Sequence, residues 1–198
     1  MKKIVFECET ITPMFMYGAD GTTPELRPAS IKGVMRFWWR AINGNLPLDD
    51  YKENDKLKKG LKSQEADIFG NTDKKSSFSI RTSSTQILQT EKINPLPHKF
   101  KKDGRALFEI SSFKTNQIFE ITFIGKNLEL VENIFKLTTI LGGFGQRSRR
   151  GFGSIQIIGS EVLSSTESIE NLIKEVNSAF KYKSTINYPY ITHVTLKS

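Results

Sequence analysis

One stretch near residue 150 restricts the fold of this chain more than any other. Residues 142–154, GGFGQRSRRGFGS, interleave five glycines with three arginines and two phenylalanines. An apolar helical pattern precedes the stretch and a strand-like pattern follows it, so a helix must stop at Gly142 and a strand must begin near Gly153. Glycine allows positive φ and close approach of the backbone to a ligand, and the planar guanidinium of arginine suits phosphate oxygens.

This stretch, which we call the glycine/arginine loop, is predicted to bind the backbone of RNA. Its amide groups can form an anion-binding concavity, and Phe144, Phe152 and the arginines can stack on bases. Its middle, residues 145–150, is expected to be free to wrap a ligand. The alternative is a flexible surface turn with solvated arginines. The predicted RNA-binding residues of the loop are Gly143, Gly145, Gln146, Arg147, Ser148, Arg149 and Arg150.

The rest of the chain reads as alternating strands and helices. Apolar alternation predicts strands, and an apolar stripe with helical spacing predicts helices. The predicted order is a strand over 2–12, a helix over 31–42, a strand over 78–82, strands over 107–113 and 117–124 joined by a hairpin turn at 114–116, a helix over 128–141 and a strand over 153–158. Ser30 and Asn127 are the expected N-caps of the two helices.

The connections carry weaker signals. A short helix is expected between Asp49 and Leu61, followed by a helical turn at 65–69 that Gly70 stops. A further helix is expected over 166–181 and a strand over 190–196.

This order predicts an α+β, ferredoxin-like (RRM-like, βαββαβ) domain. Its antiparallel sheet would carry both helices on one face, with the glycine-rich loop between the second helix and the last strand. We expect this domain to span residues 1–160, and residues 161–198 to form a C-terminal helix and strand.

The first predicted helix carries a row of positive charge. Lys32, Arg36 and Arg40 share one face because they are four residues apart. Like charges at this spacing destabilise a helix, so an acidic partner is expected, either RNA phosphates or Asp and Glu side chains of the fold. Trp38 and Trp39 point about 100° apart, so one is predicted to be core and the other to lie at the margin of the core, at a partner contact or under a base.

Charge and cysteine content limit the class of protein. The net charge of +8 favours a polyanionic partner. The Pro-broken segment 84–106 adds His98 and three more predicted RNA-binding residues, Lys99, Lys101 and Lys102. Its part from Glu91 to Arg105 is expected to be mobile alone and ordered by RNA or a neighbouring subunit. The single cysteine, Cys8, excludes an internal disulfide and fits a cytoplasmic location. No apolar run reaches membrane-spanning length, and no spacing typical of a metal or cofactor site is present.

Three motifs in order resemble the RAMP superfamily of CRISPR proteins: PASIKGVMR (28–36), EADIFG (65–70) and GGFGQRSRRGFGS (142–154). FWWRA (37–41), with TPMFMYGAD (12–20) upstream, resembles more specifically the first-subunit family of type III-B (Cmr) effector complexes.

The resemblance implies a non-catalytic subunit that binds guide RNA (crRNA) and target RNA. It would assemble with other RAMP subunits near the guide 3′ end in antiviral defence. Members of this family usually carry two RAMP domains, so residues 161–198 would be a remnant or the start of a second one. Two alternatives remain: a metal-independent endoribonuclease, with His98, His193 or Asp20 as candidate groups, and a pure assembly subunit whose basic face meets acidic protein.

Overall fold

The centre of the molecule is a four-stranded antiparallel sheet. The computed structural model describes residues 1–96, 104, 108–159 and 166–177. The strands are β1 (Lys2–Thr10), β4 (Phe78–Ser83), β7 (Ile118–Gly125) and β8 (Ile155–Ile157), in the order β4-β7-β1-β8. The predicted alternation is confirmed, because inward-facing Phe6 and Cys8 stand opposite Ile121 and Phe119 in the register of β1 and β7.

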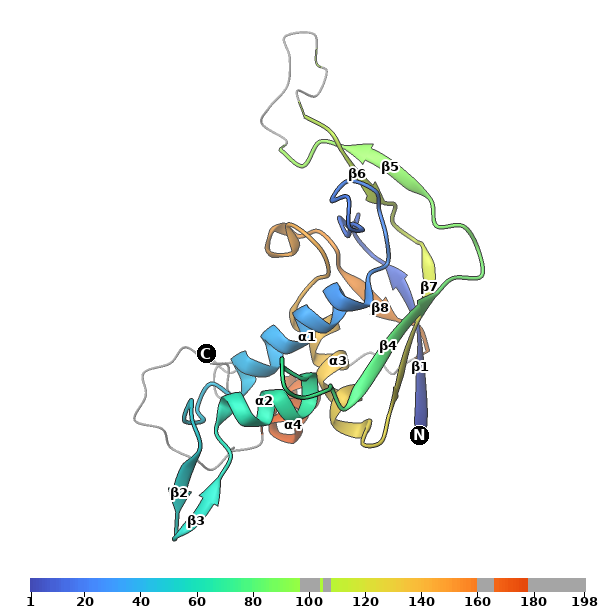
Figure 1. Ribbon diagram of the computed structural model, residues 1–198. Helices are drawn as coiled ribbons and strands as arrows, with labels where there is room; N and C mark the ends of the chain where they lie inside the picture. Colours follow the sequence, from blue (N-terminus) through green and yellow to red (C-terminus); the bar gives the residue numbers. More distant parts are fainter. Residues whose placement is uncertain (97–103, 105–107, 160–165, 178–198) are drawn as a thin grey trace.

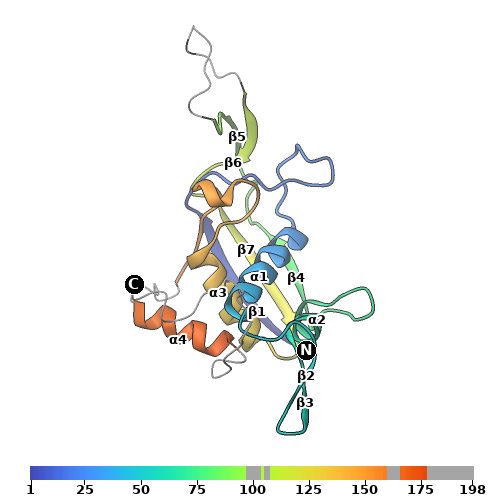
Figure 2. The ribbon, with the colours of Figure 1, turned by 90° about the vertical axis from the view of Figure 1, so that its left-hand side faces the viewer.

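Two helices lie side by side on one face of this sheet, α1 (Pro28–Ile42) and α3 (Glu129–Leu141) (Figure 1, Figure 2). Their buried stripes meet the sheet in an aromatic core. The ring of Phe135 from α3 lies 4.9 Å from that of Phe6 and 5.1 Å from that of Phe123. From α1, Trp39 is 1% exposed and is therefore the core tryptophan.

A further helix, α4 (Thr166–Val176), packs against α3 and α1. Its stripe, Leu172, Ile173 and Val176, belongs to the same core as the sheet. Directly after it, the Asn177 side-chain amide donates a 2.8 Å hydrogen bond to the Ile42 carbonyl at the end of α1. No helix in the described residues is both long enough and apolar enough to cross a membrane.

Two antiparallel ribbons project from this body (Figure 1). One is β2 (Tyr51–Glu53) with β3 (Lys56–Lys58), which leads into α2 (Leu61–Phe69). The other is β5 (Thr90–Ile93) with β6 (Ile110–Phe113). Gly70 ends α2 at φ +80°, as expected for a glycine that stops a helix.

The expected helix between Asp49 and Leu61 is wrong, since most of that range is the β2–β3 hairpin. Asn54 and Asp55 adopt φ of 49° and 59° at its tip. Positive φ at both central positions is the conformation of a type I′ turn, which joins two antiparallel strands and interrupts a helix.

The expected hairpin over 107–124 is also wrong, because β6 pairs with β5 and not with β7. The connection at 114–116 is tied instead to the end of β1. Thr10 accepts a 2.7 Å bond from the Asn116 amide, and its hydroxyl donates a 2.7 Å bond to the Lys114 carbonyl. These bonds direct the chain away from β6 before β7 begins.

Both predicted helix caps are wrong. Helix α1 begins at Pro28 with Arg27 at the N-cap, because proline at the first helical position has a suitable φ and no amide to satisfy. Ser30 therefore lies inside the helix. Helix α3 has Leu128, and not Asn127, at its N-cap.

Candidate nucleic-acid interface

The glycine/arginine loop leaves α3 at Gly142 and folds back on the segment that follows β1. The Phe144 amide donates a 2.7 Å bond to the Gly153 carbonyl, which closes the base of the loop. The Gln146 amide donates a 2.7 Å bond to Phe15, and the Gly153 amide a 2.9 Å bond to Pro13. The loop is thus attached to a neighbouring segment as well as closed at its base.

The glycines serve this close packing. Gly145 has φ +86° and Gly153 has φ +72°. A Cβ atom on Gly145 would overlap the carbonyl oxygen of Phe15, and one on Gly153 would overlap that of Phe144. The prediction that the whole range 145–150 is free is therefore wrong at Gly145 and Gln146, whose backbone is packed against its neighbours.

Both loop phenylalanines contact the protein, and the prediction that they stack on bases is wrong for Phe144, whereas for Phe152 it stays a prediction. Phe144 is 1% exposed, with its ring 6.2 Å from that of Phe135 in the core. The ring of Phe152 packs 4.9 Å from that of buried Phe15. Burial of apolar rings stabilises the loop; it removes Phe144 from the surface and leaves Phe152 half-buried.

The arginines occupy the part of the loop that stays outside. Ser148–Arg150 form one 3₁₀ turn, flanked by Arg147 at φ 59° and Gly151 at φ 84°. Arg149 and Arg150 are exposed and Arg147 is half-buried. Within the described residues none of the three has an ion-pair partner.

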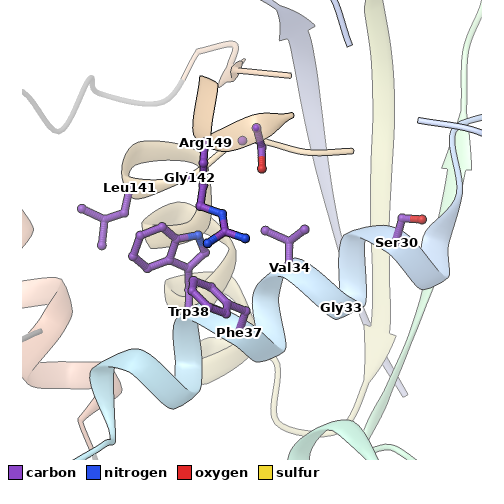
Figure 3. Close-up of a pocket in the computed structure, with 10 residues that line it drawn as sticks. Ser30, Gly33, Val34, Phe37, Trp38, Leu141, Gly142 and Arg149 are labelled. Atoms are coloured by element: carbon purple, nitrogen blue, oxygen red, sulfur yellow. The ribbon is translucent and has the colours of Figure 1, made fainter. Parts of the chain in front are cut away.

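A cavity of about 590 Å³ lies between the exposed side of α1 and this loop (Figure 3). Its walls combine aromatic side chains of α1 with glycines and polar groups of the loop. Phe37 is 56% exposed, and its ring centroid lies 5.4 Å from that of half-buried Trp38. The lining residues are Ser30, Gly33, Val34, Phe37, Trp38, Leu141, Gly142, Gly143, Ser148 and Arg149.

A second cavity of about 450 Å³ lies next to the first and shares Ser30 and Val34 with it. It is lined by the segment after β1, including Tyr17 and Gly18, by Arg27, and by Gly145 and Gln146. Burial raises the pKa of the Tyr17 phenol, and the charge of Arg147 acts in the opposite direction. The two cavities together form a groove along α1 from Arg27 to Trp38, and Arg149 is the loop arginine that lines it.

The basic row of α1 lies elsewhere and has partners inside the protein. The Glu65 carboxylate of α2 accepts two hydrogen bonds from Arg40, one from Nε and one, of 2.6 Å, from Nη2. Glu65 Oε1 also lies 3.3 Å from Arg36 Nε. Arg36 Nη2 also donates to the carbonyls of Phe69 and Gly70, at 3.1 and 2.7 Å, at the end of α2.

Lys32 is held at the start of β4. Its ammonium group donates to Ser76 Oγ at 3.0 Å and to the Phe78 carbonyl at 3.3 Å, and it lies 4.8 Å from the centre of the Phe78 ring. Burial, with a smaller effect of Arg36, lowers the pKa of Lys32. The expectation of an acidic side chain that offsets the row is confirmed by Glu65. RNA contact by Lys32, Arg36 and Arg40 stays a prediction.

The candidate catalytic groups gain no support. Asp20 Oδ1 accepts from the amides of Thr22 and Thr23 at 3.0 Å each, and Oδ2 accepts from the Thr23 hydroxyl. The hydroxyl bond, followed by the two amide bonds, lowers the pKa of Asp20. It is therefore a turn-stabilising carboxylate. His98 and His193 lie outside the described residues, as do Lys99, Lys101 and Lys102.

The groove residues that were missing from the predicted site include four with polar or exposed aromatic side chains: Tyr17, Arg27, Ser30 and Phe37. Phe37 could have been found, because it falls off the apolar stripe of α1 and exposes a large ring. The other three carry no local signal, since the packing of the loop against the segment after β1 brings them to the groove.

Comparison with known families places most of the chain in one of them. The family model described as "RAMP superfamily" matches residues 7–156. The chain is 33% identical over 188 residues to the CRISPR system Cmr subunit Cmr1-2 of Pyrococcus furiosus, a match that covers 79% of this chain and 96% of that protein. It is 32% identical over 197 residues to subunit Cmr1-1 of the same organism, covering 91% of this chain but only 54% of that protein.

Solved structures agree in fold. The crystal structure of Cmr1 from Pyrococcus furiosus (apo form) matches with a TM-score of 0.57 and 27% identity, over 89% of this chain and 58% of that one. A chain of the type III-B Cmr-beta complex, bound to cognate target RNA and AMPPnP in the presence of ssDNA, matches with a TM-score of 0.52 over 92% of this chain and 65% of that one. At 14% identity, this second match shows likeness of fold alone.

Proposed function

This chain belongs to the RAMP superfamily, and from that membership we propose that it is a non-catalytic RNA-binding subunit of a type III-B (Cmr) CRISPR effector complex. It would bind guide and target RNA near the guide 3′ end, beside other RAMP subunits, in antiviral defence. The similarity to two Cmr1 subunits of Pyrococcus furiosus supports the assignment to this kind of complex.

The observation that carries RNA binding is the position of the loop arginines. Arg147, Arg149 and Arg150 have no ion-pair partner in the described part of the chain, although the loop that carries them is packed firmly at its base. Arg149 lines the cavity in which Phe37 exposes more than half of its surface, and Arg147 acts electrostatically on Tyr17 of the second cavity. Cationic side chains that follow a backbone, combined with aromatic faces for bases, are the usual means of binding single-stranded nucleic acid.

The topology fits the fold that such subunits need. We infer a ferredoxin-like arrangement for residues 1–160, supported by the strand order β4-β7-β1-β8 and by α1 and α3 on one face. This arrangement leaves the loop after α3 at one end of the sheet, next to the start of α1, where both can contact one ligand. For residues 161–198, the described helix α4 adds to the same core.

We further propose that the chain binds RNA without cutting it. Cleavage by attack of a 2′-hydroxyl needs a base, an acid and a stabilising cation near one phosphate. The groove supplies cations, but Asp20, the candidate carboxylate, is engaged in its own turn by Thr22 and Thr23. The groove residues therefore fit binding better than catalysis.

The test is the affinity for single-stranded RNA of the variant in which Arg147, Arg149 and Arg150 are all alanine. Each phosphate contact on single strands contributes about 0.7 to the slope of log affinity against log salt. Loss of three contacts should therefore reduce the slope by about 2 and weaken binding to different RNAs alike. Melting temperature monitors the fold.

A matched control removes the same charge elsewhere. Lys52, Lys56 and Lys58 are exposed on the β2–β3 ribbon, away from the groove, and their triple alanine variant should keep nearly the full slope. Equal losses in the two variants would show that only net charge matters. Full RNA affinity of the arginine variant at low salt would refute the proposal and favour a pure assembly role, which binding to acidic partner subunits would then test.

A further inference from the structure

The second side of the main sheet, which we call the open face, has the features of a contact surface between two copies of this chain. Helices α1 and α3 cover one side of the sheet, and Figure 1 shows no helix of the described residues on the other side. Going beyond the proposed function, we propose that the open face packs on the open face of a second copy. In this pair, β1 of one copy runs opposite to β1 of the other.

Apolar side chains are exposed on the open face. Val5 of β1 is 44% exposed and Ile118 of β7 is 48% exposed, although both belong to the two central strands of the sheet. An antiparallel sheet with one solvated face normally carries polar residues on that face. Ile124 adds a half-buried side chain opposite Lys3 in the register of the two strands. The open face therefore offers apolar surface that a second sheet can bury.

The charges of the open face are separated along the strands. Lys3 of β1 and Arg81 of β4 lie toward one end of it, whereas Glu7, Glu9 and Glu120 lie toward the other. Glu7 stands directly opposite Glu120, and like charges at opposed positions destabilise a sheet. Within the described residues, neither the two cations nor these two opposed glutamates have an ion-pair partner.

This distribution favours protein over nucleic acid as the partner of the open face. Its glutamates repel phosphate groups, and the described strands place no aromatic side chain there on which a base can stack. No group of three or more acidic, histidine or cysteine side chains in the described residues is arranged to hold a metal ion. A cationic protein side chain is therefore the group that fits opposite Glu7 and Glu120.

The open face is complementary to itself. A twofold axis that runs across the strands, between the levels of Val5 and Glu7, superposes the positive end of one copy on the negative end of the other. Lys3 then stands over Glu9 of the second copy. Arg81 lies one strand spacing, about 4.8 Å, to the side of Glu120 of the second copy. Each contact occurs twice, as in every twofold interface.

The area of the open face suits a weak dimer. At about 3.4 Å per residue, the nine residues of β1 and the eight of β7 are about 27–31 Å long, and four strands are about 19 Å wide. Since the outer strands are shorter, each copy would bury about 500 Å² and the pair about 1,000 Å², which is the lower limit of a specific interface. We therefore expect a dissociation constant of about 1–100 µM.

Sedimentation velocity of the full chain, freed of RNA and at low salt, measures this dimer over a range of about 1–500 µM. RNA has to be absent because one strand can bridge two basic chains. Arg81→Glu and Glu120→Arg are the test variants. Each by itself sets like charges against each other at both copies of the contact, and should weaken dimerisation at least about tenfold. The melting temperature at low protein concentration monitors the fold of each variant.

A mixture of the two variants is the most direct measurement. In the mixed pair the two introduced side chains have opposite charges and face each other, and the unchanged Arg81 of one chain faces the unchanged Glu120 of the other. The mixture should therefore dimerise with an affinity within about threefold of the wild type. As matched controls, Lys58→Glu and Glu53→Arg make the same changes of charge on the β2–β3 ribbon, and neither should change the affinity.

Three results would overturn the inference. A monomeric mass of the wild type at about 500 µM lies outside the expected range of affinity. A dimer that neither test variant weakens is held by another surface. A mixture that stays monomeric shows that Arg81 and Glu120 do not face each other, and a different protein would then fit the open face. None of these results depends on RNA affinity, because the groove lies on the helix side of the sheet.

Discussion

Glu65→Gln is the substitution that best tests how the basic row of α1 is stabilised. The glutamine keeps the shape and one carbonyl oxygen but removes the negative charge that lies between Arg36 and Arg40. The Glu65 side chain is only 13% exposed, so its ion pairs are less screened than surface pairs.

The expected loss follows from this partial burial. Hydrogen bonds to charged groups contribute about 1.5–3 kcal/mol, whereas exposed ion pairs contribute about 0–1 kcal/mol. Arg40 is 47% exposed and Arg36 32%, which places these pairs between the two limits. We therefore expect Glu65→Gln to lower the free energy of unfolding by about 1–2 kcal/mol. For a chain of this size, that lowers the melting temperature by about 2–8 °C.

Thermal unfolding at low and high salt measures this effect, with Glu132→Gln as the matched control. Glu132 pairs with Lys136 one turn along α3, with both side chains about 30% exposed, and such a pair contributes only about 0.3–0.5 kcal/mol. If Glu65→Gln costs no more than the control, solvent screens the α1–α2 pair and our reasoning is refuted. RNA affinity gives a second readout: an increase in Glu65→Gln would place the basic row at the RNA interface, because its charge would no longer be offset.

Three further predictions concern the core and the loop. Trp39→Ala should lower the free energy of unfolding by about 3–5 kcal/mol because the side chain is fully buried. Trp38→Ala should lower it clearly less, and equal shifts in denaturant midpoint would contradict the assignment of Trp39 to the core. Gly153→Ala should lower the free energy of unfolding by more than the roughly 1–2 kcal/mol that a left-handed backbone conformation costs alanine, since the new Cβ would overlap a carbonyl oxygen. Gly151→Ala should lower it by only that amount in the same assay, because the space around Gly151 is open. Burial, with a smaller effect of the neighbouring Glu7, raises the pKa of Cys8 from 9.0 to about 12. Iodoacetamide should therefore not modify Cys8 in the native chain at pH 8 but should do so after unfolding. The free energy of unfolding should fall as the pH rises from about 9 toward 12, because only the unfolded thiol loses its proton in that range.

The sequence could predict the elements of the main body because their signals are local. Alternation along residues 2–10 and 118–125 determined which side of each strand is buried, as Phe6 and Phe119 confirm. Gly70 and Gly142 were found as helix stops for the same reason, since the conformation of a glycine depends mostly on its neighbours in the chain. The order of motifs also indicated the RAMP superfamily, which the family comparison bears out.

What the sequence could not decide was which distant atoms meet. The Arg40–Glu65 pair joins residues 25 positions apart, and the hydroxyl bond of Thr10 to Lys114 joins residues 104 positions apart. Pairing of this kind depends on the positions that the whole core imposes on both partners.

The glycine/arginine loop combines both situations. Its composition determined by itself that the chain would leave α3 there and turn sharply. Only the tertiary structure decided that Phe144 and Phe152 turn inward against Phe135 and Phe15, while the arginines remain outside. The physical reason is that burial of a ring depends on apolar surface offered by another segment: α3 offers it to Phe144 through Phe135, and the segment after β1 offers it to Phe152 through Phe15.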